Sequence, residues 1–415
     1  MTTLSSAALS AQHIWDHCEE LARCSEQPGA LTRIFLSKEQ AAASQLALHW
    51  MREAGMQARI DAIGNVVGRY EGDKPGLPCL MLGSHLDTVR DAGKYDGPLG
   101  VVSAIECVRV LNAAGRRLPF AIEVVGFSDE EGVRFGATLL GSRAVAGTFD
   151  PAALATKDRA GISMREALDN AGFDANTLSA AARKREEILA YAELHIEQGP
   201  VLEAEGLAVG TVTAINGFSR RRVTITGFAG HAGTVPMRLR QDALTTAAEC
   251  VLAVERIGRG EPDLVATVGR IEAFPGAINV IPGEVRFTLD IRAPRDELRL
   301  AAVAQITAEI TRLCKARGLA VAFETLQDNP VAASALWMMA QMDAAIAAEG
   351  LPQFRLPSGA GHDGMAIADI ADIVMLFVRC EKGISHNPAE RVTLADVDAG
   401  ARVLLRFIEN FKRPA

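Results

Sequence analysis

The sequence predicts an α/β protein in which a second domain is inserted into the first. Its 415 residues exceed the ~100–200 residues of one ordinary domain. Through most of the chain, apolar strand patterns alternate with helical patterns, which is typical of a mixed, partly parallel sheet. The middle third has the order strand–helix–strand–strand–helix–strand, which predicts a ferredoxin-like domain. We therefore expect a discontinuous main domain at 1–214 plus 329–415 and an inserted domain at 215–328.

The individual elements follow from periodicity and turn residues. Strands of the main domain are expected over 64–72, 77–88, 119–132 and 372–379. Its helices are expected over 8–27, 38–55, 97–115, 333–349 and 394–412. The region 150–190, rich in Ala, Lys, Arg and Glu, predicts a helical excursion. The inserted domain is expected to have strands over 218–230, 264–274, 283–294 and 319–327 and helices over 239–258 and 295–317.

Composition excludes several functional classes. The net charge of −8 and the pI of about 5.6 give no basic nucleic-acid footprint. The N-terminus lacks a basic segment followed by an apolar one, and no apolar run approaches the ~20 residues that span a bilayer. Seven cysteines, an odd number without a CxxC pair, argue against a disulfide framework. We expect a cytoplasmic protein with neither nucleic-acid nor membrane partners.

Acidic residues and histidines follow the apolar strands, where open α/β sheets place their sites. His85 and Asp87 share one face of a strand end, and Asp87 could fix the tautomer of His85. Asp96 precedes a helix. Its two carboxylate oxygens could bridge two cations, or it could simply cap that helix.

Three consecutive acids, Asp129, Glu130 and Glu131, follow the next strand. Adjacent carboxylates repel one another unless they are solvated or bind cations. They therefore form either an exposed loop or a metal ligand beside a general base. His195 and His386 accompany two further strands. A lone histidine is more often structural, but four such clusters favour a site for Zn²⁺, Mn²⁺ or Co²⁺.

The segments GSHLDT, YDGPLG, DEEG, GHAGTVPM and GISHNPAE occur in this order. With them the chain resembles, essentially end to end, the dinuclear-metal amidohydrolase superfamily that includes aminoacylase, carboxypeptidase G and bacterial dipeptidases. The resemblance implies a zinc-peptidase-like catalytic domain with an inserted dimerisation and lid domain. It implies two divalent ions (Zn or Mn, with Co possible), held by His85, Asp96 and His195 and by Asp96, Glu131 and His386. It also implies that Glu130 is the general base and that Asp87 orients His85.

One position distinguishes the branches of this superfamily. His195, in ELHIEQGP, stands where the peptidase branch usually has an acidic ligand. Together with SGAGHDGM and FVRCEKGISHNP, it resembles the hydantoinase/carbamoylase branch, which acts on ureido compounds. This resemblance implies hydrolysis of N-carbamoyl-L-amino acids to amino acid, ammonia and CO₂.

The substrate contacts are expected mainly in the inserted domain. Arginine binds a carboxylate bidentately, so Arg220 and Arg292 are candidates, although residues 220–222 could form a solvated strand face. His231 is either a turn histidine or, by resemblance, an oxyanion-stabilising group that acts across a homodimer. The resemblance implies further substrate contacts from Gln198, Asn279, Gly361 and His362. We expect His362 to donate or accept a hydrogen bond rather than to bind a metal ion.

Other functions remain open on the sequence. Allantoate amidohydrolase differs only in substrate, and β-ureidopropionase belongs to the same branch. His195 argues against a dipeptidase or aminoacylase. The complete set of candidate metal ligands argues against a catalytically inactive binding protein. Three histidines on the expected N-terminal helices, His13, His17 and His49, look structural.

Overall fold

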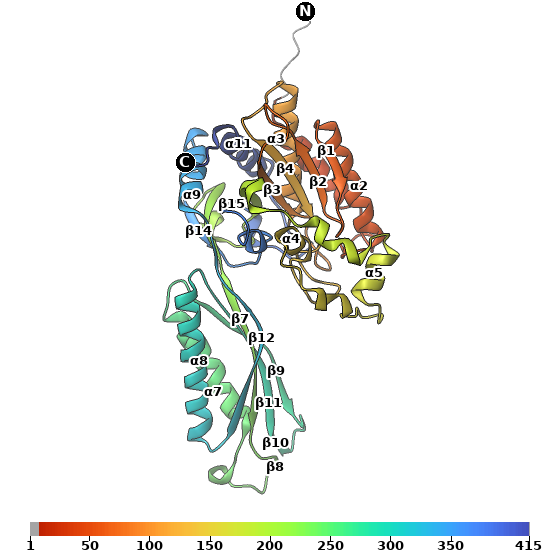
Figure 1. Ribbon diagram of the computed structural model, residues 1–415. Coiled ribbons are helices and arrows are strands. Elements are labelled where there is room, and N and C mark those ends of the chain that lie inside the picture. Colours follow the sequence, from red (N-terminus) through yellow and green to blue (C-terminus); the bar gives the residue numbers. More distant parts are fainter. Residues whose placement is uncertain (1–7, 415) are drawn as a thin grey trace, which may run out of the picture. The chain divides into compact units, whose positions relative to one another are not determined.

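The computed structural model describes residues 8–414, which form two compact units (Figure 1). Unit 1 contains the described chain up to Thr213, Ala333–Leu356 and the chain from Ala360 onward. Unit 2 contains Ala214–Ala332 and Pro357–Gly359. Unit 2 is thus inserted in sequence between parts of unit 1. Among the described residues, no helix is both long and apolar enough to cross a membrane.

Unit 1 is built on a nine-stranded mixed sheet. In order across the sheet the strands are β1 (Gln57–Ile60), β2 (Val66–Tyr70), β4 (Ala121–Phe127), β3 (Cys79–His85), β5 (Ile188–Ile196), β15 (Ile373–Val378), β6 (Val209–Ile215) and β13 (Ala332–Ala333), with β14 (Arg355–Ser358) paired to β6. The neighbours β4, β3, β5 and β15 are parallel, whereas β1, β2 and β6 join antiparallel. The mixed sheet confirms the fold class expected from the sequence.

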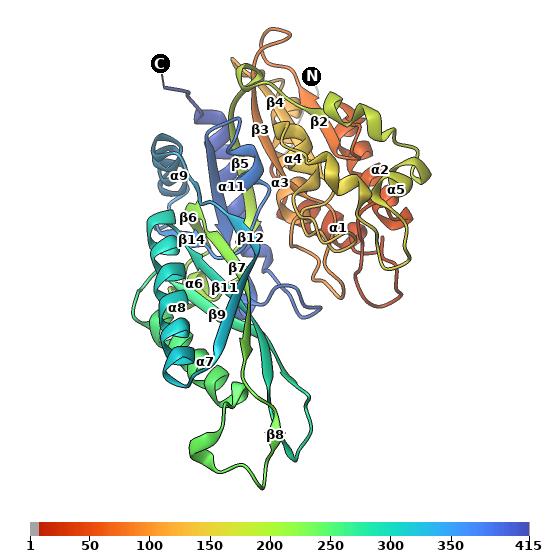
Figure 2. The same ribbon diagram turned by 60° about the horizontal axis from the view of Figure 1, so that its bottom comes forward.

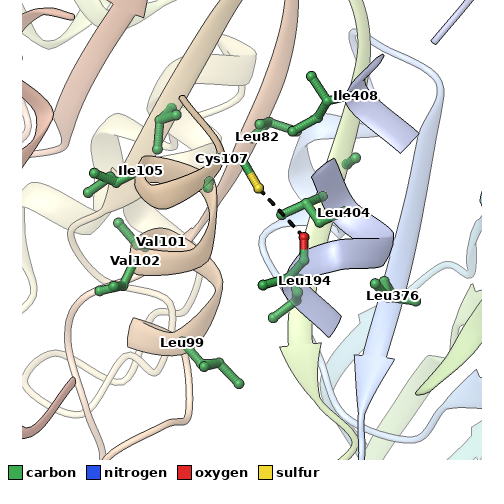
Figure 3. Close-up of a cluster of buried hydrophobic side chains, with 14 of the residues drawn as sticks. Leu82, Leu99, Val101, Val102, Ile105, Cys107, Leu194, Leu376, Leu404 and Ile408 are labelled. Atoms are coloured by element: carbon green, nitrogen blue, oxygen red, sulfur yellow. Dashed lines mark hydrogen bonds between the residues drawn. The ribbon is translucent and has the colours of Figure 1, made fainter. Parts of the chain in front are cut away.

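Helices pack on both faces of this sheet. One group shares the main core with it: α1 (Ala11–Leu21), α2 (Lys38–Glu53), α3 (Pro98–Ala113), α9 (Leu336–Ala348) and α11 (Leu394–Asn410). Figure 3 shows this core where α3 and α11 meet the strands, with Leu82, Leu194 and Leu404 pointing into it. Two short helices, α4 (Leu140–Ala146) and α10 (Gly364–Ile367), contact each other, and α10 packs on β5 and β15 at the opposite face.

The alternation of β5 divides its side chains between these two faces. Ala192 and Leu194 join the apolar core beneath α3 and α11. Glu193 and His195 therefore point to the other side, where Glu193 accepts a hydrogen bond from the main-chain N–H of Gly364 at 3.3 Å. The polar face of the central strands is thus buried rather than solvated.

Unit 2 has the ferredoxin-like order that the sequence predicts. Its elements are β7 (Gly217–Thr226), α7 (Ala243–Arg259), β9 (Val265–Phe274), β11 (Glu284–Ala293), α8 (Asp296–Ala316) and β12 (Ala320–Asn329). The antiparallel sheet has the order β12-β7-β11-β9, and α7 and α8 cover one face of it (Figure 2). Two short strands, β8 (Gly230–His231) and β10 (Val280–Ile281), pair separately.

Two parts of unit 1 differ from expectation. The region 150–190 contains one short helix, α5 (Met164–Asn170), and otherwise 3₁₀ turns at Pro151–Ala155, Ala175–Ala181 and Arg185–Glu187. Its helix-forming composition is interrupted by Pro and Gly, which break longer helices. The strands β1, β6, β13 and β14 were not expected, and β1 alternates between exposed and half-buried residues without a strong apolar pattern.

The packing of α1 on α2 generates a pH-dependent prediction. The His17 ring stacks on Trp50 with ring centroids 3.9 Å apart, and burial followed by the nearby His13 lowers the pKa of His17 to about 4. Between about pH 6.5 and pH 4 the unfolded chain therefore binds a proton that the folded chain excludes, so stability falls with falling pH. We expect His17→Phe to reduce this decrease, measured as the unfolding temperature across that range. His49→Phe, on the exposed side of α2, is the control and should leave the slope unchanged.

Candidate metal centre

The candidate site lies where the parallel strands of unit 1 end. Because β3, β4, β5 and β15 run in the same direction, their carboxyl ends meet at one edge of the sheet. His85 ends β3, His195 lies near the end of β5, and the acidic loop with Glu130 and Glu131 follows β4. His386 follows β15 after a short turn. The structure brings these side chains together with Asp96, which precedes α3.

Asp96 stands between two groups of potential ligands. Its Oδ1 lies 3.1 Å from His195 Nε2 and 3.5 Å from His85 Nε2. Its Oδ2 lies 3.1 Å from His386 Nε2, which is 3.2 Å from Glu131 Oε1. Ligand atoms at ~2.0–2.1 Å from one tetrahedral ion are separated by roughly 3.3 Å. The spacing therefore fits two cations that share the Asp96 carboxylate.

Hydrogen bonds fix the tautomers of the two histidines near Asp96 Oδ1, His85 and His195. His85 Nδ1 lies 3.0 Å from the main-chain carbonyl of Asp87, and His195 Nδ1 lies 2.9 Å from that of Ile196. Since a carbonyl only accepts, each Nδ1 carries the proton and each Nε2 offers its lone pair. Within residues 8–414, the buried atoms His195 Nε2 and Asp96 Oδ1 have no hydrogen-bond partner. A cation bound between these two buried acceptor atoms would give each of them a partner.

The electrostatics of the cluster are strongly perturbed. Burial alone would raise the pKa of Asp96, but contacts with His195, His386 and His85 hold it well below its usual range. Contacts with Asp96 and Glu131 raise the pKa of His386 to about 10. Burial, and then the adjacent Glu131, raise the pKa of Glu130 well above its usual range. Glu130 is thus a buried carboxyl whose affinity for a proton is raised, a property that suits a group that exchanges protons near neutral pH.

The alternative interpretations of the acidic residues do not apply. The cap position of α3 is Gly97, no side chain caps that helix, and the Asp96 carboxylate faces the histidines. Asp129 and Glu130 are buried, so the acidic segment is not an exposed loop. The Asp87 carboxylate accepts the main-chain N–H groups of Glu130 at 3.0 Å and Glu131 at 3.1 Å. Asp87 therefore orients His85 through its main-chain carbonyl, while its side chain shapes the acidic loop.

Further residues surround the cluster. Gln198 Nε2 donates to Asp96 Oδ2 at 2.9 Å, and the His362 ring lies 4.4 Å from that of His195 between centroids. A side chain on Gly361 would begin 3.7 Å from Glu130 Oε1. Glu193 was not among the residues expected from the sequence, but its carboxylate groups with the rings of His195 and His362. Its signal was the i, i+2 spacing to His195 on one strand face.

The predicted substrate residues of unit 2 form two pairs. Arg220 and Arg292 lie on the sheet face opposite α7 and α8 and share Asp290, which Arg292 contacts bidentately at 2.8 and 2.9 Å and Arg220 at 3.1 Å. Both guanidinium groups also lie over the Phe218 ring. His231 and Asn279 are neighbours at the β8–β10 pair, where Ala232 N–H donates to the Asn279 carbonyl. His231 Nδ1 accepts from Gly233 N–H at 3.0 Å, so Nε2 carries the proton.

A mixed sheet covered by helices, with this histidine–carboxylate cluster where its parallel strands end, is the arrangement expected of a metal-dependent hydrolase. The chain belongs to peptidase family M20/M25/M40, whose model matches residues 81–410. It is 43% identical to an N-carbamoyl-L-amino acid amidohydrolase of Geobacillus stearothermophilus, covering 96% of this chain and 98% of the relative. It is 40% identical to an allantoate deiminase of Arabidopsis thaliana, covering 94% and 80%. A solved hydantoinase/carbamoylase-family amidase from Burkholderia multivorans is similar in structure, with a TM-score of 0.89, 35% identity and coverage of 96% and 97%.

The shared position of Asp96 generates a prediction about metal binding. Asp96→Asn leaves one oxygen and introduces an N–H donor, so it should weaken both groups of ligands. We expect the affinity for Mn²⁺ or Zn²⁺ to fall by more than the ~10–100-fold typical of residues that only support a ligand. The measurement is metal content after dialysis. Asp396→Asn, an equally buried aspartate that pairs with Arg379, is the control. Wild-type metal content in Asp96→Asn would contradict the assignment.

Proposed function

We propose that the protein hydrolyses the ureido C–N bond of N-carbamoyl-L-amino acids, releasing amino acid, ammonia and CO₂. The observation that carries the proposal is the histidine at position 195, with Nε2 3.1 Å from the shared carboxylate of Asp96. By resemblance, a histidine there is typical of enzymes that act on ureido compounds. The 43% identity to an N-carbamoyl-L-amino acid amidohydrolase supports the same substrate class.

We propose that the centre holds two divalent ions, Zn²⁺ or Mn²⁺ with Co²⁺ also suitable. His85, Asp96 and His195 would hold one ion, and Asp96, Glu131 and His386 the other. Bound divalent ions lower the pKa of a coordinated water toward ~7 and polarise a carbonyl oxygen. The donor set of imidazoles and carboxylates without thiolate suits these metals.

Glu130 would carry the proton through the reaction. It takes a proton from the attacking water as the C–O bond to the ureido carbon forms. It returns that proton to the leaving nitrogen as the C–N bond breaks, giving the free amino acid. The carbamate that remains decomposes to ammonia and CO₂. His231, protonated at Nε2, is proposed to act across a homodimer and to donate to the developing oxyanion.

The arginine pair would recognise the substrate carboxylate. Arg220 and Arg292 bring two positive charges to one negative charge on Asp290, which leaves a net positive charge for an anionic ligand. Gln198, Asn279, Gly361 and His362 are proposed as further substrate contacts. The pair would favour ureido acids over neutral ureas, since a neutral ligand leaves that charge uncompensated.

We also propose a homodimer formed through unit 2, which would then act as dimerisation and lid domain. The edge strand β9 supports it, because Val265 and Ile271 are 55% and 47% exposed there. Light scattering would test the proposal through the mass in solution. A cytoplasmic location remains a prediction from the sequence.

A second candidate function is hydrolysis of allantoate, favoured by the 40% identity to a plant allantoate deiminase. Ammonia release with Mn²⁺ or Zn²⁺ would separate the candidates, using N-carbamoyl-L-amino acids, N-carbamoyl-β-alanine and allantoate as substrates. An N-acetyl-amino acid and a dipeptide test the aminoacylase and dipeptidase alternatives. We expect the highest kcat/KM with an N-carbamoyl-L-amino acid. Preference for allantoate would select the second candidate, and inactivity on the whole panel would favour a silent binding protein.

The role of Glu130 generates a separate prediction. Glu130→Gln removes the proton acceptor without removing a proposed metal ligand, so kcat should fall by about 10²–10⁴-fold while metal content is retained. Steady-state kinetics and metal analysis of the same preparation measure both. Glu131→Gln is the comparison and should lose metal as well as activity. Near-normal turnover in Glu130→Gln would exclude it as the general base.

A further inference from the structure

Glu390 is a buried carboxylate beside the metal centre that has no role in the function proposed above. It lies in the loop after β15, four residues beyond His386, and is 3% exposed. Its Oε1 accepts the main-chain N–H of Tyr95 at 2.8 Å and that of Asp96 at 3.2 Å. One oxygen atom therefore holds the turn that presents the Asp96 carboxylate.

The other oxygen of Glu390 reaches the loop that carries His386. Ser385 Oγ lies 3.0 Å from Glu390 Oε2 and 2.9 Å from Asp96 Oδ2. A hydroxyl has one hydrogen, so Ser385 donates to one of these two carboxylates at a time. Glu390 and Ser385 thus join the Asp96 turn to the His386 loop, although Asp96 and Glu390 are 294 residues apart in sequence.

The chain leaves space for this carboxylate at Gly93. A Cβ atom at position 93 would lie 2.1 Å from Glu390 Cδ and 2.2 Å from its Oε1. These separations are far below van der Waals contact, so any side chain there displaces the Glu390 carboxylate. The turn before Asp96 therefore accommodates the Glu390 carboxylate in two ways, through the missing side chain of Gly93 and through the two main-chain hydrogen bonds.

We propose that Glu390 is a positioning residue for the metal centre. By fixing the Asp96 turn and the His386 loop to each other, it keeps one oxygen of Asp96 toward His85 and His195 and the other toward His386. A buried carboxylate that only supported the fold would have no need to contact both segments that supply ligands. The inference rests on the proposed metal centre and adds a residue on which its affinity depends.

The test is the Mn²⁺ affinity of the full chain, measured by competition with a fluorescent chelator. Glu390→Ala leaves the two N–H groups and Ser385 without this partner, and we expect the affinity to fall about 10–100-fold. Glu390→Gln should stay close to wild type, because its amide oxygen can accept both N–H groups and its NH₂ can donate to Ser385 Oγ. Gly93→Ala should weaken binding while the carboxylate remains in the chain.

A matched glutamate separates positioning from general stability. Glu106 is 2% exposed and accepts the main-chain N–H of Ser10 at 2.9 Å, but contacts none of the proposed ligands. Glu106→Ala should lower the unfolding temperature and leave Mn²⁺ affinity unchanged. Wild-type affinity in Glu390→Ala would overturn the inference, as would equal losses in Glu390→Gln and Glu390→Ala.

Two further outcomes are decisive. If Glu390→Ala does not fold, Gly93→Ala decides, and wild-type affinity in that variant overturns the inference. If the wild-type chain binds no Mn²⁺, Zn²⁺ or Co²⁺, the proposed metal centre itself fails. Failure of the inference and failure of the proposed function are therefore distinguishable.

Discussion

The parallel alignment of β4, β3, β5 and β15 is the constraint on which the site depends. Parallel strands that share a direction end at one edge, so polar residues that follow different strands and lie far apart in sequence meet there. Each strand brings apolar residues to the core on one face and delivers a polar group where it ends. Asp96, from the turn before α3, lies at the centre of this edge and contacts histidines from three different segments.

Burying so many carboxylates costs free energy unless each is given donors. For the supporting acids around the candidate centre, the donors are mainly main-chain N–H groups and hydroxyls. Asp87 accepts from the loop that carries Glu130, and Glu193 accepts from Tyr191, Ser84 and Gly364. These bonds tie the supporting acids to the backbone. They leave the Asp96 carboxylate to its histidine neighbours, Gln198 and Ser385, which is the division expected between supporting groups and the proposed metal ligands.

Much of this arrangement could be predicted from the sequence, because strand ends and short polar motifs are local signals. The expectation of a ferredoxin-like insertion followed from element order, and the mixed sheet from the alternation of strands and helices. The role of the Asp87 side chain could not be predicted, because it depends on the path of a loop more than forty residues away. Glu390 was missed for the same reason. Nothing in the local sequence indicates that its carboxylate meets the turn at Tyr95, and only the assembled fold shows it.

The insertion of unit 2 has a consequence for how the protein comes to be active during synthesis. The strand that completes the central sheet, β15, and the loop with His386 emerge only after all of unit 2 has been made. Until then β5 has an unpaired edge and the Asp96 turn lacks its partners from the C-terminal segment. A chain that stops before β15, whether ribosome-bound or truncated, therefore lacks His386 and the contacts that Ser385 and Glu390 make with the Asp96 turn. Synthesis of β15 and the His386 loop closes a very long loop and supplies the last of the proposed ligands.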